Sequence, residues 1–369
     1  MKKAIKKLMA AMLAVAMLCA MAVPAFAAVD LSNHTFKAYQ IFSGKFEDEK
    51  LSNVQWGSGV VGNELLAELQ KETAFATCDS AEKVADALTG YTETSSELKK
   101  FEEIVAKNLN ENNAVTGTGS LDLDAGYYLI VDTTDVADKD DAKNLTLLKV
   151  TNATNVTPQV KTDKPTVEKK VKDTDDTTDT TTDWQDSADY DIGDTIPYQL
   201  TATMGDLSKF DTYYVEFVDT MTHLTYTGIT SVEVGSTKLT ASEYHVTWDK
   251  ASKKLKVSID NVKKYSATKG TTIVVEYTAT LDSDANIGAT GNPNTVYLRY
   301  SNNPNGTGYG QTAPDENIVF TYRLKIDKVD QDENPLKGAA FELLKKDKDD
   351  NWNSIEVLNA TKDSEGNYV

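Results

Sequence analysis

Three polar side chains are predicted to face the interior of one β-rich segment. Lys169 follows the β-branched Val167 by two residues, so both share one face of a strand, because side chains alternate along a strand. Asp219 alternates with Phe217, and Asn294 alternates with apolar residues of a later strand. A lysine between core residues is costly unless it is paired or neutral. The alternative is a lysine at a strand edge whose amine extends to water.

An amine, a carboxylic acid and a carboxamide held together in an apolar interior could react. Burial lowers the pKa of a lysine and favours the protonated form of a carboxylic acid, so neutral Lys169 would be a nucleophile. Protonated Asp219 could hydrogen-bond the carboxamide oxygen of Asn294 and transfer protons while ammonia leaves. The product would be an intramolecular Lys169–Asn294 isopeptide bond, formed once and without cofactor or metal. By the loop-entropy treatment of disulfides, closing a loop of about 125 residues constrains the unfolded chain by roughly 5 kcal/mol.

Other chemistry finds little support in the sequence. Cys78 is the one cysteine outside the first 27 residues, so it cannot form an internal disulfide, and we interpret it as a small buried residue rather than a nucleophile. None of the three histidines lies in a recognisable catalytic or metal-binding motif. Acidic stretches at 138–141 and 330–333 lack the glycine and terminal glutamate of a calcium-binding loop and are interpreted as turns. An enzyme that acts on external substrates is therefore the weakest interpretation.

The strands that must position the three residues lie in a segment assigned to residues 161–321. Apolar and polar residues alternate in five runs, at 196–204, 215–221, 255–259, 273–281 and 294–300. Short alternating strands separated by turns predict a β-sandwich of immunoglobulin-like architecture. The acidic stretch 173–183 has almost no apolar residues, so we expect a solvated, mobile loop there.

Two further segments flank this sandwich. Residues 28–160 should mix strands at 126–131 and 145–150 with helices, one at 80–90 and another that begins at Ser96. Residues 322–369 hold three or four expected strands, too few to bury a sandwich core, so we expect a domain truncated by the end of the sequence. The fold class expected overall is mainly β, with some helix in the N-terminal domain.

The N-terminus and the charge indicate an exported protein. Residues 1–27 combine a lysine-rich head, an apolar run and a small-residue site ending at Ala27, which predicts a signal peptide. The apolar run is short for the alternative, a membrane anchor. The net charge of −19 becomes more negative when the four lysines of this segment are removed. Such a surface argues against nucleic acid and anionic lipid as partners.

At these residues the central segment resembles the isopeptide-forming module of Gram-positive sortase-dependent pilins. The motifs that carry the resemblance occur in order at Pro165–Val171, Gly193–Tyr198, Phe217–Thr220, Tyr277–Leu281 and Asn294–Pro304. The resemblance implies tandem immunoglobulin-like domains and a bond between Lys169 and Asn294, promoted by Asp219.

The flanking segments carry weaker resemblances. Lys328–Asp330 and Leu336–Leu343 are similar to the opening of a collagen-adhesin B-type domain, which would make Lys328 the lysine of a second isopeptide bond whose partner lies beyond Val369. Gly126–Val131 is like a strand of the N-terminal pilin domain.

The linker that follows the N-terminal segment departs from the pilin motif in which a lysine attacks the sortase intermediate. The expected lysine position holds Gln159, so Lys161 is the nearest candidate for linking subunits and Lys164 the next. The alternative is that Lys161 is an ordinary solvated linker residue.

The function implied is a structural shaft subunit of a cell-surface pilus. Its partners would be a sortase, other pilin subunits in a covalent homopolymer, and the cell wall, reached through a C-terminal sorting signal that the sequence does not contain. The alternative is a cell-wall-anchored adhesin, or a tip or minor pilin, that binds a host protein or glycan.

Overall fold

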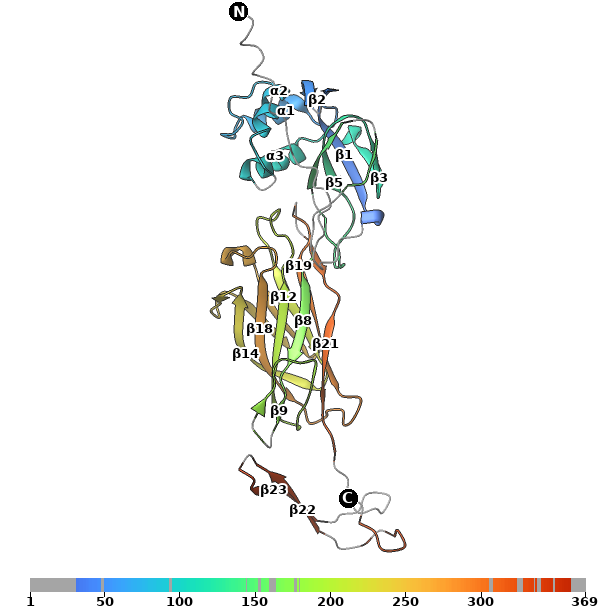
Figure 1. Cartoon of the computed structure of the whole chain (residues 1–369), viewed down its shortest axis with the longest axis vertical. Helices are drawn as coiled ribbons and strands as arrows, with labels where there is room; N and C mark the ends of the chain where they lie inside the picture. The colour runs from blue at the N-terminus through green and yellow to red at the C-terminus, as the bar shows by residue number, and fades with distance from the viewer. Residues whose placement is uncertain are drawn as a thin grey trace, which may run out of the picture.

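The computed structural model describes most of the chain from residue 31 onward. The described residues are 31–47, 50–92, 95–143, 145–151, 154–158, 164–175, 178, 180–304, 308–323, 328–334, 336, 340–347 and 349–359. The expected signal peptide, Gln159 and Lys161 lie outside them. Within these ranges, no helix is both long enough and apolar enough to cross a membrane. Figure 1 shows three parts in a row along the long axis: a helix-bearing part, a central β-sandwich and a C-terminal hairpin.

The first part packs helices against one face of an antiparallel sheet (Figure 1). Its strand order is β2-β1-β5-β6, and β3 pairs with β1. The helices are α1 (Gly62–Leu69), α2 (Ala81–Leu88) and α3 (Ser96–Lys107), with 3-10 turns at Leu31–Asn33 and Glu111–Asn113. The strands are β1 (Thr35–Glu47), β2 (Lys50–Trp56), β3 (Val115–Thr118), β4 (Leu121–Leu123), β5 (Gly126–Asp132), β6 (Leu145–Val150) and β7 (Thr154–Val156). A second apolar cluster covers the other face around Phe36 and Ile130, which explains why β5 is apolar almost throughout.

The predicted helices and strands of this part are confirmed. Ser80 caps α2, accepting a hydrogen bond of 3.3 Å from the main-chain N of Lys83. Helix α3 and strands β5 and β6 lie at the expected positions.

Helix α1 and the long strand β1 were not predicted. Strand β1 contains register shifts between Gln40 and Phe42 and between Ser43 and Lys45. The first places the consecutive Ile41 and Phe42 in one core cluster and so interrupts the alternation that would have indicated the strand.

The central part is the predicted sandwich of two sheets. One sheet has the order β15-β14-β18-β12-β8, and the other β11-β21-β19-β13-β17-β16, with β20 paired to β19. The first contains β8 (Thr166–Val171), β12 (Thr195–Thr203), β14 (Leu224–Val234), β15 (Thr237–Lys238) and β18 (Thr272–Leu281). The second contains β11 (Ser187–Asp189), β13 (Val215–Met221), β16 (His245–Asp249), β17 (Lys254–Ile259), β19 (Asn292–Ser301), β20 (Tyr309–Gln311) and β21 (Asp315–Phe320). A 3-10 turn spans Val262–Tyr265.

Alternating burial within these strands builds one shared core. In β12, β18 and β19 every second residue is buried, so each strand contributes one face to the space between the sheets. The strand β8 lies at the end of its sheet, yet its main chain also contacts the opposite one. The N–H of Lys169 donates to Oδ2 of Asp315 on β21 over 2.7 Å. The two sheets are therefore joined beside Lys169.

The stretch 173–183 is less irregular than predicted. Strand β9 (Thr174–Asp175) pairs with β10 (Thr180–Thr181) in a short antiparallel hairpin. Hydroxyl contacts between facing threonines, such as Thr174 and Thr181 at 3.2 Å, favour this pairing without apolar residues. Most of its described residues are exposed, as a solvated segment requires.

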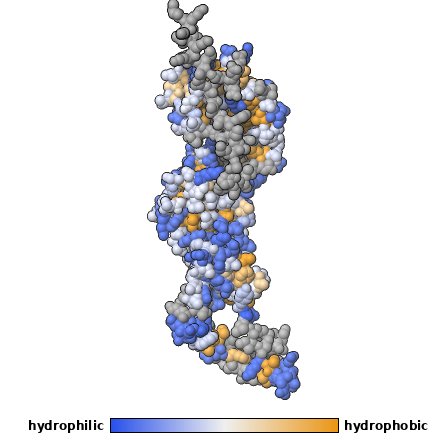
Figure 2. Space-filling model, viewed as in Figure 1, coloured by the Kyte–Doolittle hydropathy of each residue, from blue (hydrophilic) through white to orange (hydrophobic). Residues whose placement is uncertain are grey.

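The C-terminal part is a hairpin with little core of its own. Strands β22 (Ala340–Lys346) and β23 (Trp352–Asn359) pair antiparallel. Leu344 is 41% exposed and Trp352 is 64% exposed. Figure 2 shows hydrophobic residues at the surface of this end, below a predominantly hydrophilic sandwich. Lys328, expected to face a domain interior, is exposed in this arrangement because the described strands around it form no second layer.

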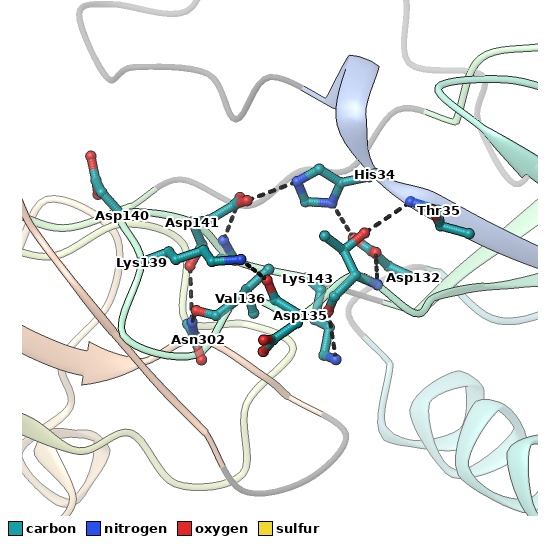
Figure 3. Close-up of polar contacts among 12 residues, drawn as sticks. His34, Thr35, Asp132, Asp135, Val136, Lys139, Asp140, Asp141, Lys143 and Asn302 are labelled. Atoms are coloured by element: carbon teal, nitrogen blue, oxygen red, sulfur yellow. Dashed lines mark hydrogen bonds and ion pairs between the residues drawn. The ribbon is translucent and has the colours of Figure 1, made fainter.

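A connecting segment after β5 joins the first part to the sandwich (Figure 3). Fully buried Asn302 donates Nδ2 hydrogen bonds to the carbonyls of Val136 at 2.7 Å and Asp141 at 3.0 Å. Main-chain bonds from Asp138 N to Tyr309 O and from Gln311 N to Lys139 O continue the contact. The segment therefore adds to the edge of the sandwich much as a strand would.

His34 ties the same segment back to the first part. Its Nδ1 lies 2.5 Å from Oδ2 of Asp132, at the end of β5, and its Nε2 lies 2.9 Å from Oδ2 of Asp141 (Figure 3). The ring is 1% exposed. On another side of the junction, Lys99 contacts Asp211 and Lys209 contacts Glu102. These polar contacts fix how the two parts meet.

Replacing Asn302 tests this junction. Asn302→Ala leaves the carbonyls of Val136 and Asp141 without their donor, so the free energy of unfolding should fall by about 1–3 kcal/mol. Urea unfolding measures the loss, and proteolysis within 133–143 should become faster. The control Asn112→Ala changes an exposed asparagine of the first part and should have little effect. Equal stability of the two variants would show that Asn302 does not hold the junction.

Candidate functional site

The structure brings Lys169, Asp219 and Asn294 together in the interior of the sandwich. Each is fully buried. Lys169 comes from β8 in one sheet, whereas Asp219 and Asn294 come from the neighbouring strands β13 and β19 in the other. In that register Asn294 pairs with Met221, so Asp219 is its diagonal neighbour on the same face. The contact between the amine of Lys169 and the carboxylate of Asp219 therefore spans the gap between the sheets.

A tyrosine hydroxyl lies at the centre of the cluster. The OH of Tyr277, on β18, accepts hydrogen bonds from Nζ of Lys169 and from Nδ2 of Asn294, each over 2.9 Å. It donates to Oδ2 of Asp219 over 2.7 Å. The same carboxylate oxygen lies 2.5 Å from Nζ of Lys169. Tyr277 thus connects the amine, the acid and the nitrogen that would leave as ammonia.

Aromatic rings wall the amine off from solvent. The rings of Tyr198 and Tyr277 stack with centroids 5.2 Å apart and an interplanar angle of 12°. Nζ of Lys169 lies 5.0 Å from the first centroid and 5.3 Å from the second. Such faces attract a cation, but they offer neither an acceptor nor water, so they also tolerate the neutral amine.

Burial dominates the electrostatics. It lowers the pKa of Lys169 from the ordinary value of 10.5, against the opposing attraction of Asp219 and Asp315. Burial, with the nearby charge of Asp219, holds the pKa of the Tyr277 hydroxyl well above its usual range, so this group stays protonated and can donate. Removing two opposite charges from water costs several kcal/mol for each ion. Burial therefore favours the neutral amine of Lys169.

These groups have the arrangement needed for an amine to attack a carboxamide. Among the described residues, Oδ1 of Asn294 and Oδ1 of Asp219 have no hydrogen-bond partner. A protonated Asp219 could direct its free oxygen toward the carbonyl oxygen of Asn294. No group of three or more potential metal ligands occurs in the described ranges. An amine, a carboxylic acid and a tyrosine hydroxyl can perform acid–base and nucleophilic chemistry.

The other candidate residues lie away from this cluster. Lys164 is only 14% exposed, and its Nζ contacts Oδ2 and the main-chain O of Asp140, each at 2.8 Å. Lys328 is exposed. Cys78 is 5% exposed in the core of the first part, where burial raises the pKa of its thiol, in agreement with the interpretation as a buried residue.

Tyr277, Tyr198 and Asp315 were not identified as site residues from the sequence. Both tyrosines occur in the motifs Tyr277–Leu281 and Gly193–Tyr198, and both alternate with core residues. The alternation predicts that their hydroxyls are buried, and a buried hydroxyl needs a hydrogen-bond partner, so this pattern could have identified both tyrosines as site residues. The sequence could not identify Asp315, because its contact with the main chain of Lys169 depends on how the two sheets pack.

Comparison with known proteins identifies the central part. Residues 192–304 match the family described as Gram-positive pilin backbone subunit 2, Cna-B-like domain. This match spans most of the sandwich, including Tyr198, Asp219, Tyr277 and Asn294. No curated protein matches the chain in sequence.

Several solved pilin structures are similar to the chain. The T6 backbone pilin of serotype M6 Streptococcus pyogenes aligns at 17% identity and a TM-score of 0.50, covering 92% of this chain and 71% of that one. The major pilin SpaD from Corynebacterium diphtheriae aligns at 17% identity and a TM-score of 0.46, covering 92% and 79%.

A third similar structure is a C-terminal fragment of the major pilin GBS80 of Streptococcus agalactiae. It aligns at 22% identity and a TM-score of 0.40, covering 49% of this chain and 64% of that one, just under two thirds of its length. The similarity to the T6 backbone pilin shows a shared fold. The chain shares its fold with the T6 backbone pilin, and its residues 192–304 match the family model of the Cna-B-like domain of Gram-positive pilin backbone subunits.

Proposed function

We propose that this chain is a shaft subunit of a Gram-positive surface pilus, and that its central sandwich is locked by an isopeptide bond between Lys169 and Asn294. The observation that carries the proposal is a buried cluster of an amine, an acid and a carboxamide from three strands. In it the amine contacts the acid, and both the amine and the carboxamide contact the hydroxyl of Tyr277. A lysine with no access to water is a costly residue for a sandwich core. Conversion to an amide removes the ionisable amine from the core.

The bond would form in a single reaction that consumes no cofactor. Nζ of Lys169 attacks Cγ of Asn294, and the charge that develops on Oδ1 is stabilised by the protonated Asp219. A proton lost by Nζ passes through Asp219 and Tyr277 to Nδ2, which already contacts the tyrosine hydroxyl at 2.9 Å. The Cγ–Nδ2 bond then breaks, ammonia leaves, and Asp219 and Tyr277 recover their protons. Folding supplies the proximity that makes the attack possible.

The position of the bond suits a subunit under tension. Strand β8 opens the sandwich and β19 lies near its end, so a pull between the two ends of the sandwich passes through both strands. A covalent link from β8 to β19 prevents the enclosed strands from unzipping. An amide cannot be reduced, which provides covalent stabilisation in a chain that has one cysteine outside residues 1–27.

Subunit linkage is the second element of the proposal. Lys161 remains the proposed nucleophile toward a sortase intermediate, because the neighbouring Lys164 is engaged by Asp140. Lys328 remains the proposed lysine of a second isopeptide bond. The partners proposed are a sortase, further copies of this subunit and the cell wall.

The intact mass of the purified chain tests the internal bond. We expect a mass lower than the sequence mass of the mature chain by one ammonia. Lys169→Met and Asn294→Ala should each restore the full mass, and Asp219→Ala should do so with both reacting partners present. Lys170→Met is the matched control, because Lys170 is on the outer face and pairs with Glu168 and Asp186. A wild-type chain of full mass would refute the bond.

The proposed relay can be tested by removing one oxygen atom. Tyr277→Phe keeps the ring that stacks on Tyr198 but removes the hydroxyl between the acid and the leaving nitrogen. We expect the rate of ammonia loss to fall by about 100-fold, the lower range for acid–base catalysis. A mass time course of newly synthesised chain measures that rate. Tyr226→Phe, whose ring centroid lies 6.2 Å from that of Tyr277, should react at the normal rate. Equal rates for the two variants would exclude the relay.

Subunit linkage can be tested separately. A chain fused to a sorting signal and incubated with a pilin-class sortase should form a ladder of covalent multimers on denaturing gels. Lys161→Arg, which keeps the charge but removes the primary amine, should abolish the ladder, whereas Lys164→Arg should keep it. A ladder that persists in Lys161→Arg would move the linkage to another lysine.

A further inference from the structure

A second asparagine lies beside the cluster with no role in the scheme above. Asn317, on β21, is 1% exposed. Among the described residues, neither its Nδ2 nor its Oδ1 has a hydrogen-bond partner. Leaving a buried polar group unpaired costs about 1–3 kcal/mol. An asparagine with both polar atoms unpaired is therefore expensive at a core position that could hold an apolar residue.

The strand register places Asn317 next to the reacting carboxamide. Strands β19 and β21 pair antiparallel with Asn294 directly opposite Asn317. Both side chains are buried on the same face of the sheet. Directly opposite residues have Cβ atoms about 4.5–5.5 Å apart, which is within reach of a hydrogen bond between two asparagine side chains.

The unpaired atoms of the two asparagines are complementary. Oδ1 of Asn294 is an acceptor without a donor, and Nδ2 of Asn317 is a donor without an acceptor. Nδ2 of Asn294 is already engaged by Tyr277. A bond from Asn317 to Oδ1 would therefore fix the carboxamide with its leaving nitrogen toward the tyrosine and its carbonyl oxygen toward a donor.

Strand β21 is also anchored at the nucleophile. Asp315, two residues before Asn317 and opposite Val296, accepts the main-chain N–H of Lys169 over 2.7 Å. The same strand thus contacts the strand of the amine through Asp315 and flanks the carboxamide through Asn317. This arrangement gives β21 a part in aligning both reactants.

We propose that Asn317 is a positioning residue for the isopeptide reaction, donating from Nδ2 to Oδ1 of Asn294 so that the carboxamide is oriented for attack. The inference rests on the proposed Lys169–Asn294 bond. The donor stabilises negative charge on Oδ1 as the C–O bond lengthens, together with Asp219. No atoms of Asn317 are transferred, so the product remains one amide and one ammonia.

The test compares rates of ammonia loss in newly synthesised full-length chain, followed by intact mass. Asn317→Leu preserves volume without a donor and should slow the reaction by about 100-fold, the effect of removing one oxyanion donor. The control Val319→Ala weakens the same buried face of β21 without removing a polar group, and should react at the wild-type rate.

A shape-matched variant provides a readout that packing alone would not change. In Asn317→Asp the ionised side chain cannot donate, but the protonated one can. The ratio of this variant's rate to the wild-type rate should therefore rise as pH falls. Other titratable groups surround the site and affect the pH dependence of both rates, so their effect cancels in the ratio. These groups are Lys169, Asp219, Tyr277 and Asp315. A ratio that does not change with pH would overturn the assignment, even if Asn317→Leu failed to fold.

The outcomes separate the two proposals. A wild-type chain that loses no ammonia removes the proposed bond itself. A wild-type chain that reacts, with Asn317→Leu reacting equally fast, removes only the role of Asn317. If Asn317→Asp loses water in place of ammonia, Lys169 attacks position 317 directly, and the positioning role is likewise overturned.

Discussion

The energetic problem at the centre of this sandwich is the burial of a lysine amine where water cannot reach it. Lys169 is fully buried beside two stacked tyrosine rings, and its polar partners are Asp219 and Tyr277. An ion pair there keeps its Coulomb attraction but loses hydration, a balance that seldom favours stability. Burial favours the neutral amine, which is also the form that can act as a nucleophile. In the proposed reaction, the same burial that makes the residue costly favours its nucleophilic form.

The topology determines which groups this amine can meet. Strand β8 is the last strand of one sheet, and through Asp315 it also contacts β21 of the other. An edge position lets one side chain point between the layers while the main chain contacts both sheets. Strands β13, β19 and β21 lie side by side, so their inward residues present an acid and two carboxamides as a row. A link across that row connects both layers.

Much of this arrangement could be predicted from the sequence because strands carry a period of two. That period predicts that Lys169, Asp219 and Asn294 face the interior of the sandwich from three separate strands. The period cannot predict the register between strands, because the residues that lie opposite one another belong to strands that are far apart in the sequence. Asn317 is an example. The alternation of its own strand predicts only that it is buried, and its proposed role follows from its pairing with Asn294. Strand β1 was missed for another local reason, the register shifts within it.

Sequencing of branched peptides is the most direct measurement of the covalent claim. After complete proteolysis of the purified chain, tandem mass spectrometry should recover one branched peptide in which the side chain of Lys169 is joined to position 294 with loss of ammonia. Recovery of both residues on separate, unmodified linear peptides would contradict the account.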